Sequence, residues 1–301
     1  MKYIATFLLS ALTAVSVSAQ TADLPQYNPN SVNAIPRYEH LFKVRVWREI
    51  DLREKQNEGF FSKNGEISAL IIKAIKSGEI PAIYASDSLT TVKPKETFLQ
   101  DLTAQKATTY DPWSPSASYL IDEIVAYNGQ NYQALADNTG KNPASSPSEW
   151  EKTTQGKANE YLASMITTMS IMEDVIFDRR RSRLYYDVQA VQLTVPAANT
   201  VSGAVNIDLG WVKYKDLEKV FRNHPREAVW FNRQNSAENK NFADAFLLRL
   251  FRASIYKVEN PDDARISEIY SDNGRPYRES VWAREWEEIR LMEKEHNLWE
   301  Y

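Results

Sequence analysis

The most regular hydrophobic pattern in the chain predicts a helix near residues 67–75. Apolar side chains recur there at the spacing of one α-helical face, at Ile67, Leu70, Ile71, Ala74 and Ile75. Gly78 follows where a helix C-cap is expected. The same stride predicts further helices over 158–176, where Leu162, Ile166, Met169 and Met172 are in phase, over 242–255, and from about residue 280, with Trp282, Trp286, Ile289 and Met292 on one face.

Other segments have the composition of strands. Residues 183–195 alternate with β-formers, and residues 41–47, 81–85 and 209–214 are short, apolar and β-capable. Residues 48–58 are densely charged, with opposite charges four positions apart, as on a solvated helix face. We therefore predict an α+β fold, with helices and short strands mixed in the main body and a small all-β module inserted into it.

The predicted insert covers residues 106–153. Short aromatic-containing runs alternate there with Asn, Gly, Pro and Ser, and Asn128-Gly129 is a strong hairpin-turn signal. The main body then consists of residues 39–105 and 154–301.

The N-terminus has the pattern of a secretory signal peptide. Lys2 precedes an apolar run, and Val17-Ser18-Ala19 supplies small residues, which predicts cleavage after residue 19. Residues 20–38 are rich in Pro, Asn and Ser and are expected to form an extended arm, either disordered or lying on a neighbouring subunit. The expected location is the periplasm.

Composition narrows the chemistry. The chain has no Cys, which excludes disulfides, thiolate catalysis and a lipid-anchored cysteine. Its net charge of −4 gives no electrostatic reason to expect nucleic acid as a partner. A chain that can be neither lipidated nor inserted in a bilayer is expected to stay at the envelope by holding a partner.

The sequence carries no recognisable active-site motif. His40, His224 and His296 do not have metal-ligand spacing, and hydrolase, phosphate-loop and dinucleotide fingerprints are missing. Neighbouring carboxylates such as Glu49 with Asp51 and Glu173 with Asp174 favour a solvated or Arg-paired surface. A glycosidase pair stays open, because such acids are recognised by their separation in space. We predict no enzyme, cofactor or metal.

Two charged segments with aromatic neighbours are candidate protein interfaces, since Trp and Arg are frequent anchors of such surfaces. Their candidate contact residues are Trp47, Arg48, Asp51 and Arg53 in the first and Asp178, Arg179 and Arg183 in the second.

These segments carry a family resemblance. The runs at Trp47 to Asp51, Ile176 to Leu184 and Phe231 to Asn235 resemble the GldN/PorN family of the type IX secretion and gliding-motility apparatus, over most of residues 38–270. The resemblance implies a periplasmic subunit that assembles with a GldK-type lipoprotein. The implied assembly is a ring beneath the outer membrane, containing many copies of the chain, near the GldL/GldM motor. It implies no catalytic centre.

The insert resembles the chitin-binding-type modules of carbohydrate-binding families 5 and 12. Its aromatic residues Trp113, Tyr127, Tyr132 and Trp150 form either a glycan platform or the core of a tiny module. The core is favoured, because Leu135 and the residues after it stand where chitin-binding members carry adjacent tryptophans. The first functional hypothesis is thus a non-enzymatic ring subunit. The alternative is a periplasmic protein that binds peptidoglycan or another glycan, or a carboxylate-dependent glycan hydrolase.

Overall fold

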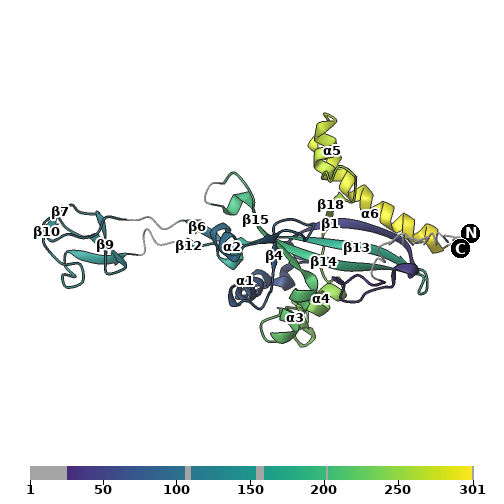
Figure 1. The fold of residues 1–301 in the computed structure, drawn as a ribbon, viewed down its shortest axis with the longest axis horizontal. Helices are drawn as coiled ribbons and strands as arrows, with labels where there is room; N and C mark the ends of the chain where they lie inside the picture. The colour runs from purple at the N-terminus through teal and green to yellow at the C-terminus, as the bar shows by residue number, and fades with distance from the viewer. Residues whose placement is uncertain (1–25, 106–109, 154–158, 201–202, 300–301) are drawn as a thin grey trace, which may run out of the picture.

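The computed structural model describes residues 26–105, 110–153, 159–200 and 203–299. The predicted signal peptide and the first residues of the predicted arm lie outside these ranges. The described chain folds as α+β, as predicted: helices pack on a large antiparallel sheet, and smaller sheets are joined to it (Figure 1).

The main sheet is antiparallel, with strand order β18-β1-β13-β14-β15-β4-β5. Its strands are β1 (His40–Asp51), β4 (Ile83–Tyr84), β5 (Val92–Lys93), β13 (Thr168–Asp178), β14 (Arg183–Val195), β15 (Ile207–Lys213) and β18 (Ser254–Val258). Strands β1, β13 and β14 are the long central ones. Val46 of β1 lies opposite Glu173 of β13, and Ile50 opposite Met169.

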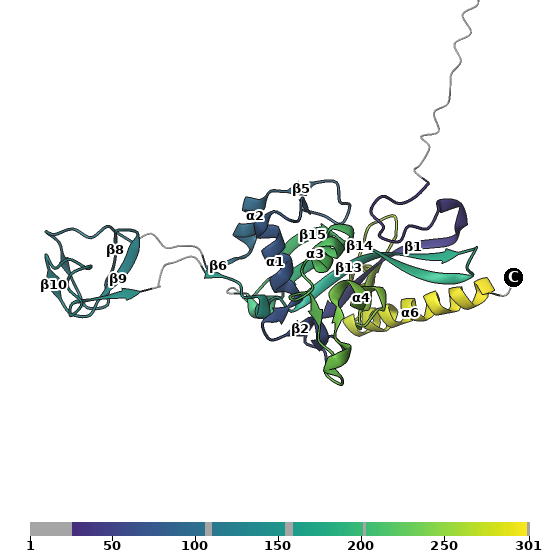
Figure 2. The same ribbon diagram turned by 90° about the horizontal axis from the view of Figure 1, so that it is seen from below.

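One face of this sheet carries two separate apolar clusters. Because side chains alternate along a strand, Val44, Val46, Arg48 and Ile50 all point to the same face. The larger cluster contains Ile50 and packs beneath α1 (Ile67–Ser77), α3 (Tyr214–Asn223) and α4 (Phe242–Leu247). The smaller cluster contains Val46 and is covered by α6 (Tyr277–Trp299), which runs along the half of the sheet away from α1 (Figure 2).

The opposite face has a third, mostly aromatic cluster. Trp47, Trp211 and Tyr256 pack there around Met172 and Ala190, and Leu89 of the loop after β4 packs against them. The central strands are therefore covered on both faces near the middle of the sheet.

The remaining elements are short. They are β2 (Phe61–Ser62), β3 (Gly65–Glu66), α2 (Lys95–Asp101), β6 (Thr103–Gln105), β12 (Asn159–Glu160), β16 (Val229–Trp230), β17 (Lys240–Asn241), α5 (Ile266–Asp272) and five 3-10 turns, at Arg37–Glu39, Glu58–Phe60, Ala163–Met165, Ala197–Asn199 and Ser236–Glu238. Strands β6 and β12, on either side of the predicted insert in the sequence, pair with each other.

Residues 110–153 form a small unit of strands: β7 (Ser118–Tyr119), β8 (Ile124–Tyr127), β9 (Gln130–Ala134), β10 (Asn138–Thr139) and β11 (Trp150–Thr153). Asn128 and Gly129 both have positive φ, 49° and 73°, as the predicted hairpin turn between β8 and β9 requires. The unit has its own core of Tyr119, Val125, Ala134 and Trp150. In Figures 1 and 2 its strands lie apart from the main sheet.

Several predicted elements are confirmed. The helix at 67–77 ends on Gly78 in the left-handed conformation, with φ of 81°, and its N–H donates to the carbonyls of Ala74 and Ile75. The strand predicted at 183–195 and the last helix are also present.

Three helical predictions were wrong in whole or in part. Residues 168–178 form strand β13, and every residue from Met169 to Asp178 is buried, so the polar alternation of a one-sided strand is missing. Residues 48–51 continue β1, and turns follow it. The run 242–255 divides into helix α4 and strand β18, with Arg249 between them at φ of 52°.

Candidate interaction site

The predicted contact residues lie at three positions along strand β1 and its neighbour β13. Asp51 is at one end of β1, Trp47 and Arg48 are in its middle, and His40 at the other end lies opposite Asp178 of β13. The two ends of β1 are about 36 Å apart along the strand. The predicted residues therefore lie in separate groups along β1 and β13.

Arg48 lies inside the protein, between the two apolar clusters of its face. Its side chain is 5% exposed, and its Nε donates to the fully buried carboxylate of Glu173. Arg249 donates to the same carboxylate, with 2.7 Å between Nη1 and Oε2. The guanidinium of Arg249 also lies 4.0 Å from the centre of the Tyr186 ring. We call Arg48, Glu173, Tyr186 and Arg249 the buried charge cluster.

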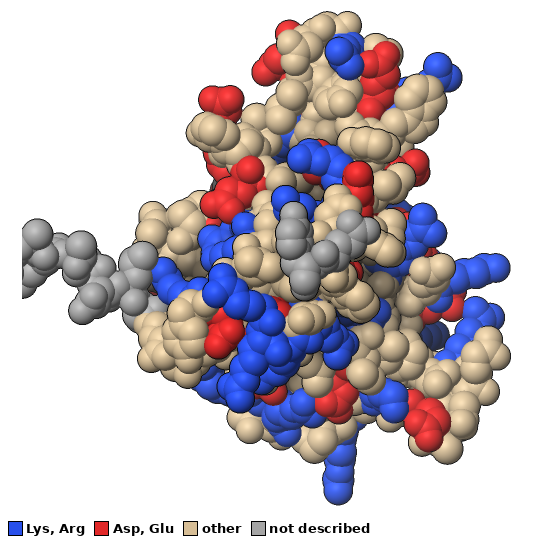
Figure 3. Space-filling model, turned by 90° about the vertical axis from the view of Figure 1, so that its right-hand side faces the viewer, with Lys and Arg blue, Asp and Glu red and all other residues tan. Residues whose placement is uncertain are grey.

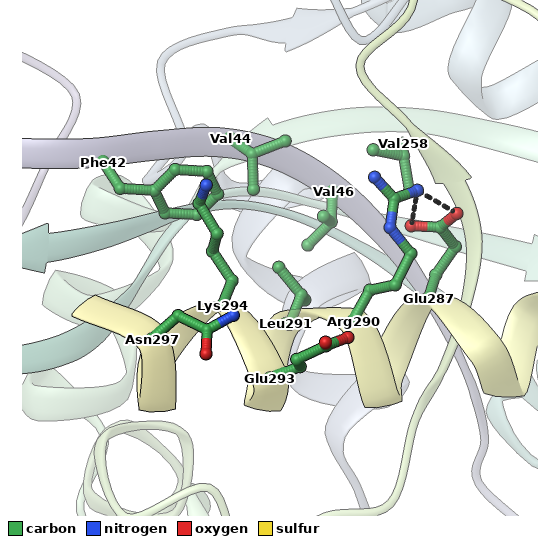
Figure 4. A pocket seen from close by; sticks show the side chains of 10 residues that line it. All are labelled: Phe42, Val44, Val46, Val258, Glu287, Arg290, Leu291, Glu293, Lys294 and Asn297. Carbon is green, nitrogen blue, oxygen red and sulfur yellow. Dashed lines mark hydrogen bonds and ion pairs between the residues drawn. The ribbon is translucent and has the colours of Figure 1, made fainter. Parts of the chain in front are cut away.

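This cluster also holds helix α6. Glu288 of α6 accepts a hydrogen bond from Nη1 of Arg48, the side chain whose Nε donates to Glu173. One turn further along α6, Leu291 points at Val44 and Val46 of β1, while Glu287 and Arg290 pair with each other nearby (Figure 4). An ion pair and one buried leucine thus fix α6 on the sheet.

Trp47 points to the opposite face and is 6% exposed. The ammonium of Lys257 lies 4.2 Å from the centre of its ring, and Lys257 in turn pairs with Asp87. Trp47 and Arg48 therefore stabilise the fold of this chain itself.

Asp178 shapes the hairpin between β13 and β14. Its buried carboxylate accepts hydrogen bonds from the backbone N–H of Arg180 and Arg181 and from Nη1 of Arg181, at 2.8, 3.3 and 2.7 Å. Burial alone would raise the pKa of Asp178, but these hydrogen bonds hold it below its ordinary value. The carboxylate therefore stays charged and keeps the turn in one conformation.

The hairpin presents arginines to solvent. Arg37, Arg179, Arg180, Arg181 and Arg183 are all exposed, and the backbone N–H of Arg179 donates to the carbonyl of Glu39 at 2.8 Å. Figure 3 looks onto this end of the molecule and shows Lys and Arg gathered over it. We call these five residues the arginine surface. Two of its members, Arg179 and Arg183, are predicted contact residues.

Asp51 and Arg53 form an ordinary surface pair at the other end of β1. Nε of Arg53 is 3.3 Å from Oδ1 of Asp51, and the side chains of Asp51 and Arg53 are 40% and 59% exposed. Such pairs contribute about 0–1 kcal/mol.

The aromatic residues of the small unit do not form a flat platform. Trp150 is buried, and its Nε1 donates to the carbonyl of Lys141 at 2.9 Å. Trp113, Tyr127 and Tyr132 are half-buried and meet edge to face, with interplanar angles of 84° and 68°. Leu120, Ile121 and Leu135 are also exposed, and Leu135 stands at 43%. Successive sugar rings of a glycan stack on aromatic rings whose faces lie in one plane. The rings of Trp113, Tyr127 and Tyr132 do not share a plane.

Sequence reasoning missed most of the buried charge cluster. Glu173 was noted as a surface or Arg-paired acid, whereas Tyr186, Arg249 and Glu288 were not singled out at all. An arginine within the apolar run Leu247 to Phe251 was the available signal. A charge in such a run requires a partner, but the partner is 76 positions away in the sequence.

The half-buried carboxylate of Asp187, on the face of the sheet opposite Arg48, gives a pH prediction. Burial raises the pKa of Asp187 to about 6, although a hydrogen bond from Gln189 favours the charged form. The folded chain therefore binds this proton more tightly than the unfolded chain, whose Asp has a pKa near ~4. The stability contribution of Asp187 is complete below that value and is lost as the pH rises to about 6.

Asp187→Asn should consequently be more stable than the parent at pH 7.5, by roughly 1–3 kcal/mol, with the difference vanishing near pH ~4. Urea unfolding of both chains between these pH values measures it. An unchanged difference across the range would contradict the raised pKa.

The described part of the chain shows no metal-binding arrangement: no group of three or more His, Asp or Glu residues there is placed to hold an ion. Within residues 26–105, 110–153, 159–200 and 203–299, no helix combines the length and apolarity needed to cross a membrane.

A comparison with known protein families identifies the family of this chain. A family model described as "Gliding motility associated protein GldN" matches residues 35–300. The chain belongs to the GldN family. The GldN match runs through both halves of the main body and through the small unit between them. The family is a component of gliding motility and type IX secretion, and it is not a known enzyme family. No curated protein matches the chain.

Proposed function

We propose that this GldN-family chain is a non-enzymatic structural subunit of the type IX secretion and gliding machinery in the periplasm. It assembles with a GldK-type lipoprotein at the inner face of the outer membrane, in a ring that contains many copies and lies near the GldL/GldM motor. The observation that carries the proposal is the arginine surface. Asp178 fixes the backbone of the hairpin, so presenting the arginines to a partner costs little backbone ordering at binding.

The carboxylates of the site support a structural role over a hydrolytic one. Glu173 and Asp174 are each engaged by two cations, Glu173 by Arg48 and Arg249, and Asp174 by Lys43 and Arg45. Burial opposes ionisation of Asp174, but these pairs keep its pKa below the ordinary range. A general acid needs a raised pKa, so this acid is unsuited to that task. The glycan-binding alternative has less support because the half-buried rings of the small unit meet edge to face.

Charge reversal of the arginine surface tests the proposal. In the full chain expressed in its native host, Arg179, Arg180 and Arg183 are changed together to Glu. We expect co-purification with the lipoprotein to fall by more than about tenfold, together with gliding and secretion, because a charge-complementary interface becomes repulsive. Thermal unfolding should change little, since all three side chains are exposed.

A matched control reverses three other exposed cations, Lys63, Lys141 and Arg226, which changes the net charge by the same amount away from the hairpin. It should leave co-purification intact. Normal assembly of the hairpin variant, or equal loss in the control, would overturn the assignment of this surface.

A further inference from the structure

Helix α6 has apolar side chains on two opposite sides. On the inner side Leu291 is buried, and Ala283 and Leu298 pack with it against the sheet. On the outer side Trp282, Trp286 and Ile289 are 56%, 56% and 47% exposed. At 100° per residue these three lie within a narrow stripe along the helix. We call Trp282, Trp286 and Ile289 the outer stripe.

The outer stripe is held rigidly. Glu288 binds Arg48, and Leu291 packs on β1, so the opposite side of the helix faces away from the sheet. Exposed tryptophans aligned on a fixed helix are typical of a protein interface, because they bury much area and lose little conformational freedom.

The charges at the two ends of the stripe have opposite signs. Arg278 precedes Trp282 by one turn, with its guanidinium 5.1 Å from the centre of the Trp282 ring. Glu293 follows Ile289 by one turn and is exposed. Both fall on the outer side of α6. From end to end this side of the helix therefore presents a cation, an apolar stripe with the exposed Glu285 beside it, and an anion.

Such a surface is complementary to itself in the antiparallel direction. We infer that two copies of this chain pair through α6 about a two-fold axis, with Trp282 opposite Ile289 of the partner and Arg278 opposite Glu293 of the partner. The antiparallel arrangement also opposes the two helix dipoles favourably. A two-fold contact closes after two copies, so a ring requires a second, different contact.

This pairing goes beyond the proposed function, because it concerns the isolated chain and uses none of the arginine surface. Its test is the concentration dependence of molar mass, measured by sedimentation equilibrium on the purified mature chain. We expect a dimer that dissociates on dilution. Trp282→Ser and Trp286→Ser should each weaken it by more than about tenfold, since every residue of a two-fold interface is used twice.

Trp299→Ser is the matched control. Trp299 is on the same helix and is 62% exposed, but it lies about 100° around the helix from Trp282. This variant should dimerise like the parent.

Exchanging the charges of Arg278 and Glu293 shows whether the partner on the outer stripe is a second copy of this chain. Arg278→Glu alone and Glu293→Arg alone should each weaken the dimer about threefold or more, because each brings like charges together. The two changes combined restore opposite charges and should restore dimerisation. Only a second copy gives this result; a different protein docked on the stripe would be lost in all three variants. A chain that stays monomeric at high concentration, or a double variant that fails to recover, would overturn the inference.

Discussion

Glu173→Ala is expected to lower the free energy of unfolding by about 3–5 kcal/mol, the cost of leaving buried charges without their partner. The side chains of Arg48 and Arg249 are 5% and 28% exposed, and both donate to the carboxylate of Glu173. Arg48 would keep only its pair with Glu288, in a nearly buried position with apolar clusters on either side. Urea unfolding followed by circular dichroism measures the loss. A change below about 1 kcal/mol would show that solvent reaches Arg48.

The control removes the charges together. Arg48→Met, Glu173→Leu and Arg249→Met combined leave no unpaired charge in the cluster, and buried ion pairs exchanged for apolar groups are often neutral in stability. This variant should unfold within about 2 kcal/mol of the parent. It loses the contact to Glu288, so α6 amides should exchange faster with solvent than in the parent. The comparison separates the stability role of the cluster from its role in holding α6.

The elements that the sequence predicted best are those with one buried side. Helix α1 has a clear apolar face, and Gly78 marks its end. The central strand β13 was misjudged because it is buried on both faces, and its apolar residues at 169 and 172 continue a helical stride from residue 166 before the strand. The run at 242–255 was taken as one element because a reversal at Arg249 leaves no trace in hydrophobic spacing.

The candidate site was predictable only where its contacts are local. Asp178 caps a turn two and three positions away, so its contacts lie within the same short segment that the sequence marked as a candidate interface. The buried charge cluster joins residues from β1, β13 and the segment after α4, and strand pairing brings them together. No spacing within a single sequence encodes such a contact.

Phe60→Ala should cost about as much as the loss of Glu173, roughly 3–5 kcal/mol, but for a different reason. Phe60 is fully buried, and its ring centre lies 5.6 Å from that of Phe242 and 5.4 Å from that of Phe246. Truncation leaves a cavity among aromatic rings that the surrounding helices cannot close. Phe231→Ala is the control: this side chain is 45% exposed, and its loss should cost less than about 1 kcal/mol.

The positions at which Phe60→Ala speeds up hydrogen exchange show whether the main body unfolds as one unit. Phe60 belongs to the large cluster under α1, α3 and α4, whereas α6 covers the small cluster beyond Arg48 and Glu173. Strands β1 and β13 pass continuously beneath both clusters. Global opening in Phe60→Ala should therefore expose amides of β1 and β13 at both ends to hydrogen exchange by the same factor. Faster exchange confined to the Phe60 end would show instead that the buried charge cluster divides the main body into two units that unfold independently.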